Sequence, residues 1–136
     1  MYILRVYSAL MIVGTGFDLV AIPRFVRFLE RHGERGLQRL FTTSEKEYCL
    51  SQANPALSLG ARFAAKEAFY KALGTGMGST AGGWKDVEVV RLSSGRPRLM
   101  LHGRAATVAH QMQVRTIHLS MSHTAEAAGA FVVLEA

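Results

Sequence analysis

The sequence predicts an α+β fold in which an antiparallel sheet packs around one long helix. Residues 11–20 alternate between apolar and small or polar side chains, as a strand does. Residues 54–73 form a long helical pattern, with an Asn-Pro pair at its start and a glycine at its end. The last third of the chain reads mostly as short strands separated by turns. Helices and strands that segregate in this way favour an antiparallel sheet over alternating βαβ units.

The predicted first strand, MIVGTGFDLV, carries one face of Val13, Thr15, Phe17 and Leu19 and a second face of Ile12, Gly14, Gly16 and Asp18. Glycine within a strand often marks a place where another group approaches closely. We therefore expect another element to pack against this strand at its glycines.

A helix is predicted to follow, because Pro23 fits the first turn of a helix. Ile22, Phe25, Val26 and Leu29 share one face of it, and Arg24, Arg27, Arg31 and Arg35 share another. We expect Gly33 to end this helix. Ser44 and Glu47 then stand in capping-box spacing, which predicts a second short helix through about Ser51.

The longest predicted helix begins at the cap Asn54 and ends before Gly74. Many of the residues on its apolar face are alanines, which indicates that other elements pack tightly around it. Beyond this helix the pattern predicts strands at 86–92, 98–102, 117–122 and 127–134, a short helix at 103–113, and turns at 93–97 and 123–126. The strand at 127–134 is nearly all apolar, so we expect it to be central in the sheet.

Composition supports one domain, at residues 11–136. The chain has 136 residues, of which 49% are hydrophobic and 19% charged, and this suits a single core. Because Met11 begins the first predicted strand, residues 1–10 are interpreted as an extension or an upstream start. The net charge of +6 predicts an acidic partner, which composition leaves open among nucleic acid, an anionic membrane surface, a phosphorylated cofactor and an acidic protein.

The single cysteine, Cys49, excludes a disulfide framework within the chain and fits a reducing cytoplasm. We expect it to be a half-buried structural residue on a helix. The apolar run near the N-terminus lacks a convincing cleavage site and is shorter than the roughly 20 residues that cross a bilayer. Neither export nor membrane insertion is expected, and a cytoplasmic location follows.

The glycines of GTGMGS, residues 74–79, fit neither the dinucleotide fingerprint nor a P-loop, because their spacing differs and no Gly-Lys-Ser/Thr follows. The remaining interpretation is a loop whose backbone N–H groups line an anion, with Lys71 one turn before the loop. On the same helix, Glu67 has two interpretations. It forms an ordinary surface ion pair with Lys71, or it joins Asp18 as a carboxylate pair of the kind that holds Mg²⁺.

Four segments resemble a known family in the same order. They are GTGFDLV (14–20), RFAAKEAFYKALGTG (62–76), GRP (95–97) and SMSH (120–123). These motifs are similar to those of holo-[acyl-carrier-protein] synthases, the small class of 4′-phosphopantetheinyl transferases. The resemblance covers the chain from Met11 to about Glu135.

The resemblance implies an enzyme of fatty acid biosynthesis. It would move 4′-phosphopantetheine from coenzyme A to a serine of apo acyl carrier protein and release adenosine 3′,5′-bisphosphate. By motif position, Asp18 and Glu67 are implied as Mg²⁺ ligands and Lys71 as the cation beside the phosphate under attack. Glu67, directly or through a metal-bound water, is implied as the base for the serine hydroxyl.

The resemblance also implies binding residues and an assembly. Coenzyme A contacts are expected at Arg62, Lys71, Gly74, Gly76, Pro97, Ser122 and His123. Carrier protein contacts are expected on the first helix, at Arg24, Arg27, Phe28 and Arg31, as an arginine stripe around an exposed aromatic ring. A homotrimer with active sites shared between subunits is expected.

Two other functions fit part of the sequence. A small basic nucleic-acid-binding domain would account for the charge, but the strand segments lack the interleaved aromatic residues of a stacking platform. A noncatalytic binder of an acidic protein would account for the arginines and leave Asp18, Glu67 and Lys71 without a role.

Overall fold

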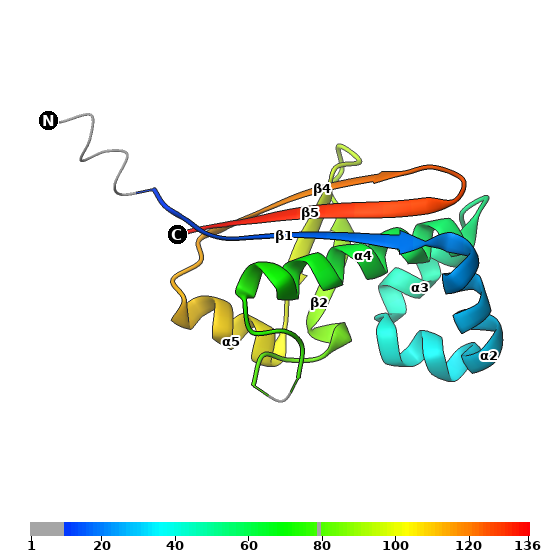
Figure 1. The fold of residues 1–136 in the computed structure, drawn as a ribbon, viewed down its shortest axis with the longest axis horizontal. Helices are drawn as coiled ribbons and strands as arrows, with labels where there is room; N and C mark the ends of the chain where they lie inside the picture. The colour runs from blue at the N-terminus through cyan, green and yellow to red at the C-terminus, as the bar shows by residue number, and fades with distance from the viewer. Residues whose placement is uncertain (1–9, 79) are drawn as a thin grey trace, which may run out of the picture.

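The computed structural model describes residues 10–78 and 80–136. Most of the segment predicted as an N-terminal extension, residues 1–9, lies outside this range. The elements run in the order β1 (Ile12–Ala21), α2 (Ile22–Leu40), α3 (Thr43–Leu50), α4 (Pro55–Leu73), the 3₁₀ turn η1 (Trp84–Asp86), β2 (Val87–Arg91), β3 (Pro97–Leu101), α5 (Gly103–Gln111), β4 (Thr116–His123) and β5 (Ala127–Glu135) (Figure 1).

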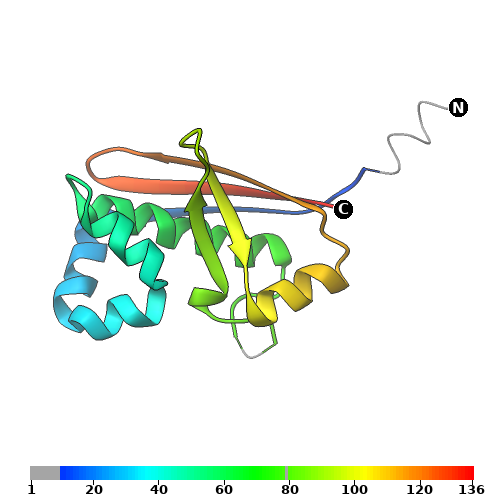
Figure 2. The ribbon, with the colours of Figure 1, turned by 180° about the vertical axis from the view of Figure 1, so that it is seen from behind.

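The predicted α+β fold is confirmed, with two antiparallel sheets in place of one. One sheet has the strand order β1-β5-β4, so the apolar strand β5 is central as predicted. The β2-β3 hairpin forms a separate sheet. Helix α4 runs along one face of the three-stranded sheet, and the hairpin crosses behind that helix (Figures 1 and 2). The long helix therefore lies at the centre of the molecule.

The two strand glycines permit this packing. A Cβ atom at Gly14 would lie 1.9 Å from the carbonyl oxygen of Ala72, and one at Gly16 would lie 1.8 Å from that of Ala68. No side chain fits at such a distance. The close approach predicted from the glycines is confirmed, and the alanines of α4 are the matching small residues on the helix.

Helix α2 consists of two helical segments joined at Gly33. Gly33 adopts φ 54° and ψ −141°, which are non-helical angles with a left-handed φ that glycine tolerates. The first segment therefore ends at Gly33 as predicted, and a second segment, which was not predicted, continues beyond this kink to Leu40. Arg35 lies beyond the kink from Arg24, Arg27 and Arg31.

The predicted cap of α3 is wrong. Thr42 is the N-cap: its Oγ1 accepts from the backbone N–H of Glu45, at 3.2 Å, and its own N–H donates to Glu45 Oε1, at 3.0 Å. The pair at 42 and 45 has the same spacing as Ser44 and Glu47, so pattern alone did not separate the two. Cys49 on this helix is completely buried rather than half-buried.

Helix α4 has the predicted ends. Asn54 Oδ1 accepts from the backbone N–H of Leu57, and Gly74 takes the left-handed conformation at the C-terminus. Among helices in the described ranges, none is both long and apolar enough to cross a membrane.

Candidate active site

Strand β1 and helix α4 bring three of the predicted residues together. Asp18, Glu67 and Lys71 line one pocket of about 700 Å³. Asp18 lies on the same strand face as Gly14 and Gly16, the face against which α4 packs. The Lys71 ammonium donates to Asp18 Oδ1 at 2.9 Å and to the carbonyl oxygen of Phe17 at 3.0 Å. The alternative in which Lys71 pairs with Glu67 is therefore wrong, since its partner is Asp18.

Burial and charge act together on Glu67. Burial raises the pKa of this carboxyl above its ordinary value, the nearby Asp18 carboxylate raises it further, and Lys71 opposes both. Two carboxylates that repel each other across a pocket are a suitable place for a cation. The Lys71 side chain is 53% exposed, so its ammonium is accessible from the solvent.

The rest of the pocket wall is apolar and basic. Its other lining residues are Leu19, Val20, Ala21, Arg24, Phe25, Phe28, Arg39, Leu40, Phe63 and Trp84. Two predicted carrier contacts, Arg24 and Phe28, thus stand beside the carboxylates, whereas Arg27 and Arg31 are exposed on α2 and do not line this pocket. Phe28 is half-buried, with its ring 6.1 Å from that of Phe25 and 4.6 Å from that of His32. The expectation of an exposed aromatic ring at this position is wrong.

The predicted coenzyme A contacts other than Lys71 lie elsewhere. Ser122 and His123, at the end of β4, line a second pocket with Phe17, Leu19 and Phe131. Arg62 is buried with its guanidinium 4.4 Å from the centre of the Tyr48 ring, and it donates to Ser58 Oγ. Gly74 and Gly76 are in the exposed loop after α4, and Pro97 begins β3. Within the described parts of a single chain, these residues do not join the Asp18 pocket.

Sequence reasoning missed two residues of the pocket wall, Arg39 and Trp84. Arg39 lies beyond the kink at Gly33, so the prediction of a helix that stops there removed it from consideration. Trp84 lies in a turn between predicted elements, where periodicity carries no signal. Its ring is 5.0 Å from that of Phe63, which places it on the side of α4 that also carries Glu67.

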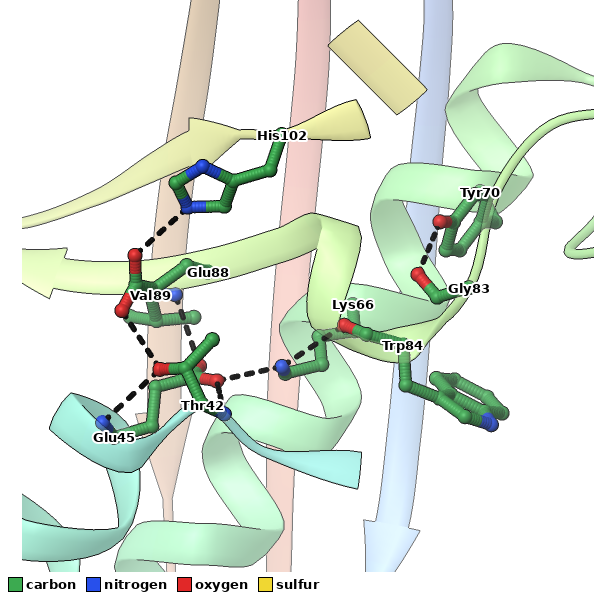
Figure 3. A network of polar contacts seen from close by, with 9 residues as sticks. All are labelled: Thr42, Glu45, Lys66, Tyr70, Gly83, Trp84, Glu88, Val89 and His102. Carbon is green, nitrogen blue, oxygen red and sulfur yellow. Dashed lines mark hydrogen bonds and ion pairs between the residues drawn. The ribbon is translucent and has the colours of Figure 1, made fainter. Parts of the chain in front are cut away.

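A buried polar network behind the pocket was missed as well (Figure 3). The Lys66 ammonium donates to Glu45 Oε1 at 2.7 Å and to the carbonyl oxygen of Trp84 at 3.0 Å. Glu45 Oε2 accepts from the backbone N–H of Val89. The one feature of the sequence that indicates this network is Lys66, a charged residue among the alanines of a helix that was expected to be tightly packed.

The network extends to the β2-β3 hairpin. Thr42 Oγ1 donates to Glu88 Oε2 at 2.7 Å, and the His102 ring lies 2.9 Å from Glu88 Oε1. Burial tends to raise the pKa of Glu88, but the hydrogen bonds from Thr42 and His102 outweigh it and hold the pKa below its ordinary value. The Tyr70 hydroxyl donates separately to the carbonyl oxygen of Gly83.

The site has the donor set that Mg²⁺ requires. Residues 10–78 and 80–136 contain no group of three or more His, Cys, Asp or Glu side chains that would enclose an ion by themselves. Asp18 and Glu67 supply two carboxylates, and Mg²⁺ is commonly held by one or two carboxylates together with water and substrate phosphates. The residues present therefore fit a magnesium ion that binds with a phosphorylated substrate.

Comparison with known proteins agrees with this geometry. Residues 14–131 match the model of the 4′-phosphopantetheinyl transferase superfamily. The holo-[acyl-carrier-protein] synthase of Koribacter versatilis is 50% identical over 127 residues, which cover 92% of this chain and 99% of that protein. The synthase of Geobacter metallireducens is 49% identical, with 92% and 98% covered.

Solved structures give the same result. The holo-[acyl-carrier-protein] synthase of Neisseria meningitidis superposes with a TM-score of 0.84 at 30% identity, and the match covers 91% of this chain and 98% of that one. The Helicobacter pylori enzyme, solved in complex with coenzyme A, superposes with a TM-score of 0.78 at 28% identity, covering 88% and 98%. By sequence and by fold, the chain belongs to the holo-[acyl-carrier-protein] synthases of the 4′-phosphopantetheinyl transferase superfamily.

Proposed function

We propose that the chain transfers 4′-phosphopantetheine from coenzyme A to a serine hydroxyl of apo acyl carrier protein, for fatty acid biosynthesis. Adenosine 3′,5′-bisphosphate is the leaving product. The observation that carries the proposal is the meeting of Asp18, Glu67 and Lys71 in one pocket, in a chain whose relatives are holo-[acyl-carrier-protein] synthases.

The side chains have the properties that this reaction needs. Charge that spreads over phosphate oxygens during transfer is stabilised by a positioned cation, and the exposed Lys71 ammonium is one. Glu67 has a raised pKa, which suits a group that accepts the proton of the serine hydroxyl near neutral pH. Asp18 holds Lys71 at the pocket until substrate enters.

Asp18 and Glu67 are the residues that would hold Mg²⁺. When bound, the ion supplies positive charge to the pyrophosphate oxygens of coenzyme A.

The carrier protein approaches over α2 in this proposal. Arg24 lines the catalytic pocket, and Arg27 and Arg31 are exposed on the same segment of helix before the kink. Acyl carrier proteins are strongly acidic, so these arginines steer the carrier and bring its serine toward Glu67.

The active protein is proposed to be a cytoplasmic homotrimer. The predicted coenzyme A contacts Ser122 and His123 lie apart from the Asp18 pocket in one chain, beside the exposed side chains of Phe17, Leu19 and Phe131. Subunit association through this face would bring the Ser122 and His123 pocket of one subunit beside the Asp18 pocket of another. It would also cover the apolar residues.

Mass spectrometry tests the activity. Apo acyl carrier protein is incubated with this protein, coenzyme A and Mg²⁺, and the carrier is weighed intact. A mass gain equal to one phosphopantetheine group is expected, and replacement of the carrier's acceptor serine by alanine should prevent it. The absence of a gain with every plausible carrier would refute the proposal.

A further inference from the structure

Lys66 and Glu45 form an ion pair in which both side chains have no solvent exposure. A buried pair of this kind stabilises a fold little, because each charge loses its hydration on burial. The mechanism proposed above uses neither residue. Lys66 directly precedes Glu67 on α4, but the two side chains leave the helix in different directions, one toward α3 and the other into the pocket.

The second bond of the Lys66 ammonium connects this pair to the pocket. It holds the carbonyl oxygen of Trp84 at 3.0 Å, in the turn that precedes β2. Figure 3 shows the Trp84 indole pointing away from the ammonium. The indole packs 5.0 Å from the Phe63 ring and lines the pocket that contains Glu67.

The ion pair also fixes the turn relative to the hairpin and α3. Glu45 begins α3 through its cap with Thr42 and accepts from the backbone N–H of Val89 in β2. The ammonium of Lys66 is therefore held from one side by a carboxylate that two other elements orient. A second of its three N–H groups donates to the Trp84 carbonyl oxygen.

We propose that Lys66 is a positioning residue, which acts through the Trp84 carbonyl to fix the indole as the wall of the substrate pocket beside Glu67. This inference rests on the proposed function. When the wall is loose, the transferred group is misplaced relative to Glu67 and Lys71, so kcat falls. The predicted coenzyme A contacts Ser122 and His123 lie in another pocket, so the KM for coenzyme A changes little.

A purely structural role for the ion pair predicts a different result, and a double variant separates the two. Lys66→Met alone leaves the Glu45 charge buried without its partner and is expected to be strongly destabilised. Glu45→Gln/Lys66→Met removes both charges, keeps an acceptor at position 45 and leaves the Trp84 carbonyl without its donor. If the pair serves only stability, this folded double variant has native kinetics.

Fluorescence gives a readout independent of activity, because Trp84 is the one tryptophan of the chain. Circular dichroism first checks that each variant is folded. For the double variant we expect acrylamide quenching of Trp84 to rise by about twofold, and kcat to fall by about tenfold or more with the KM for coenzyme A within about twofold. Lys46→Met is the matched control, since Lys46 follows Glu45 on α3 and pairs with the exposed Glu34 of α2, and its replacement should change neither quantity. Native quenching and native kcat in the folded double variant would overturn the proposal.

Variants of Trp84 provide a test that leaves the ion pair intact. Trp84→Phe keeps a flat ring and should retain kcat within about threefold, whereas Trp84→Ala removes the wall and should lose about tenfold or more. A native kcat in Trp84→Ala would overturn the proposal even if the double variant does not fold. If the unmutated protein has no transfer activity, the proposed function is refuted. The quenching comparison would still decide whether Lys66 holds Trp84.

Discussion

Asp18 and Glu67 come from elements far apart in the chain, yet they line one pocket whose cation is Lys71. We expect Asp18→Ala and Glu67→Ala each to lower transfer by about a hundredfold or more, because each removes a carboxylate that would hold the cation by which phosphate charge is stabilised. Both side chains lie at the pocket surface rather than in the core, so circular dichroism should be unchanged. Near-native turnover of either variant at limiting Mg²⁺ would contradict its role.

The pKa of Glu67 is open to direct measurement in metal-free protein. Burial and Asp18 raise this pKa and Lys71 lowers it, so Lys71→Gln should raise it further. At a given pH near the titration midpoint, less of the Glu67 carboxyl will then be ionised. Carbon-13 NMR titration of the side-chain carboxyl measures the shift. A pKa that falls in Lys71→Gln would show that the ammonium does not act on Glu67.

Some site residues were predictable and others were not, for a physical reason. Asp18, Glu67 and Lys71 stand in motifs whose residue types fit phosphate and metal chemistry. Trp84 and Arg39 belong to the site only because a turn and a kinked helix bring them there. Lys66 is hidden in the same motif as Glu67, and its role depends on a partner 21 residues away and on a backbone carbonyl. Neither contact leaves a local pattern.

At the scale of elements, the packing of β1 on α4 makes the strand glycines intolerant of substitution. The Cβ of Gly16→Ala would overlap the carbonyl oxygen of Ala68, so the strand or the helix must move. We expect a loss of about 1–3 kcal/mol in the free energy of unfolding, measured by urea denaturation. Gly83→Ala is a suitable control, because nothing lies within 4 Å of its added Cβ. Equal stability of Gly16→Ala and the native protein would contradict the packing.

Helix α2 carries the prediction for the carrier protein. Arg24→Glu/Arg27→Glu should raise the KM for carrier by about tenfold at low salt and flatten its salt dependence, because steering charges are screened by salt. The KM for coenzyme A should remain near its native value. Arg35→Glu, beyond the kink, is the control and should have a smaller effect. Steady-state kinetics at several salt concentrations measures these differences, and native carrier kinetics of the double variant would exclude a docking role.

Element types were more predictable than element ends. The strands and α4 follow from periodicity together with strong signals such as Asn54 and Gly74. The start of α3 depended on which of two overlapping capping boxes formed, and burial of Glu45 in the network favours the box at Thr42. The end of the first segment of α2 at Gly33 was predicted, but the second segment depends on tertiary packing, since its Gly36 and Leu40 are buried.

On the scale of the whole molecule, the outer face of the three-stranded sheet remains uncovered in a single chain. Phe17 is 55% exposed, Leu19 65% and Phe131 44%. We expect a homotrimer that buries these side chains, with a mass near three times 14.9 kDa in light scattering at assay concentration. Phe131→Asp should dissociate it and lower coenzyme A affinity. An active monomer at assay concentration would contradict shared sites.

The pairing of β1 with β5 has a consequence for how the protein is made. Phe17 of β1 pairs with Phe131 of β5. The strand that carries Asp18 therefore cannot form this pairing until β5, more than one hundred residues later in the chain, has been synthesised. Helix α4, whose contacts within itself are local, is able to form long before that. Closing so large a loop is slow, and β1 has unpaired backbone groups while the ribosome completes the chain. We therefore expect the pocket that contains Asp18 and Glu67 to reach its final form only after β5 has been synthesised.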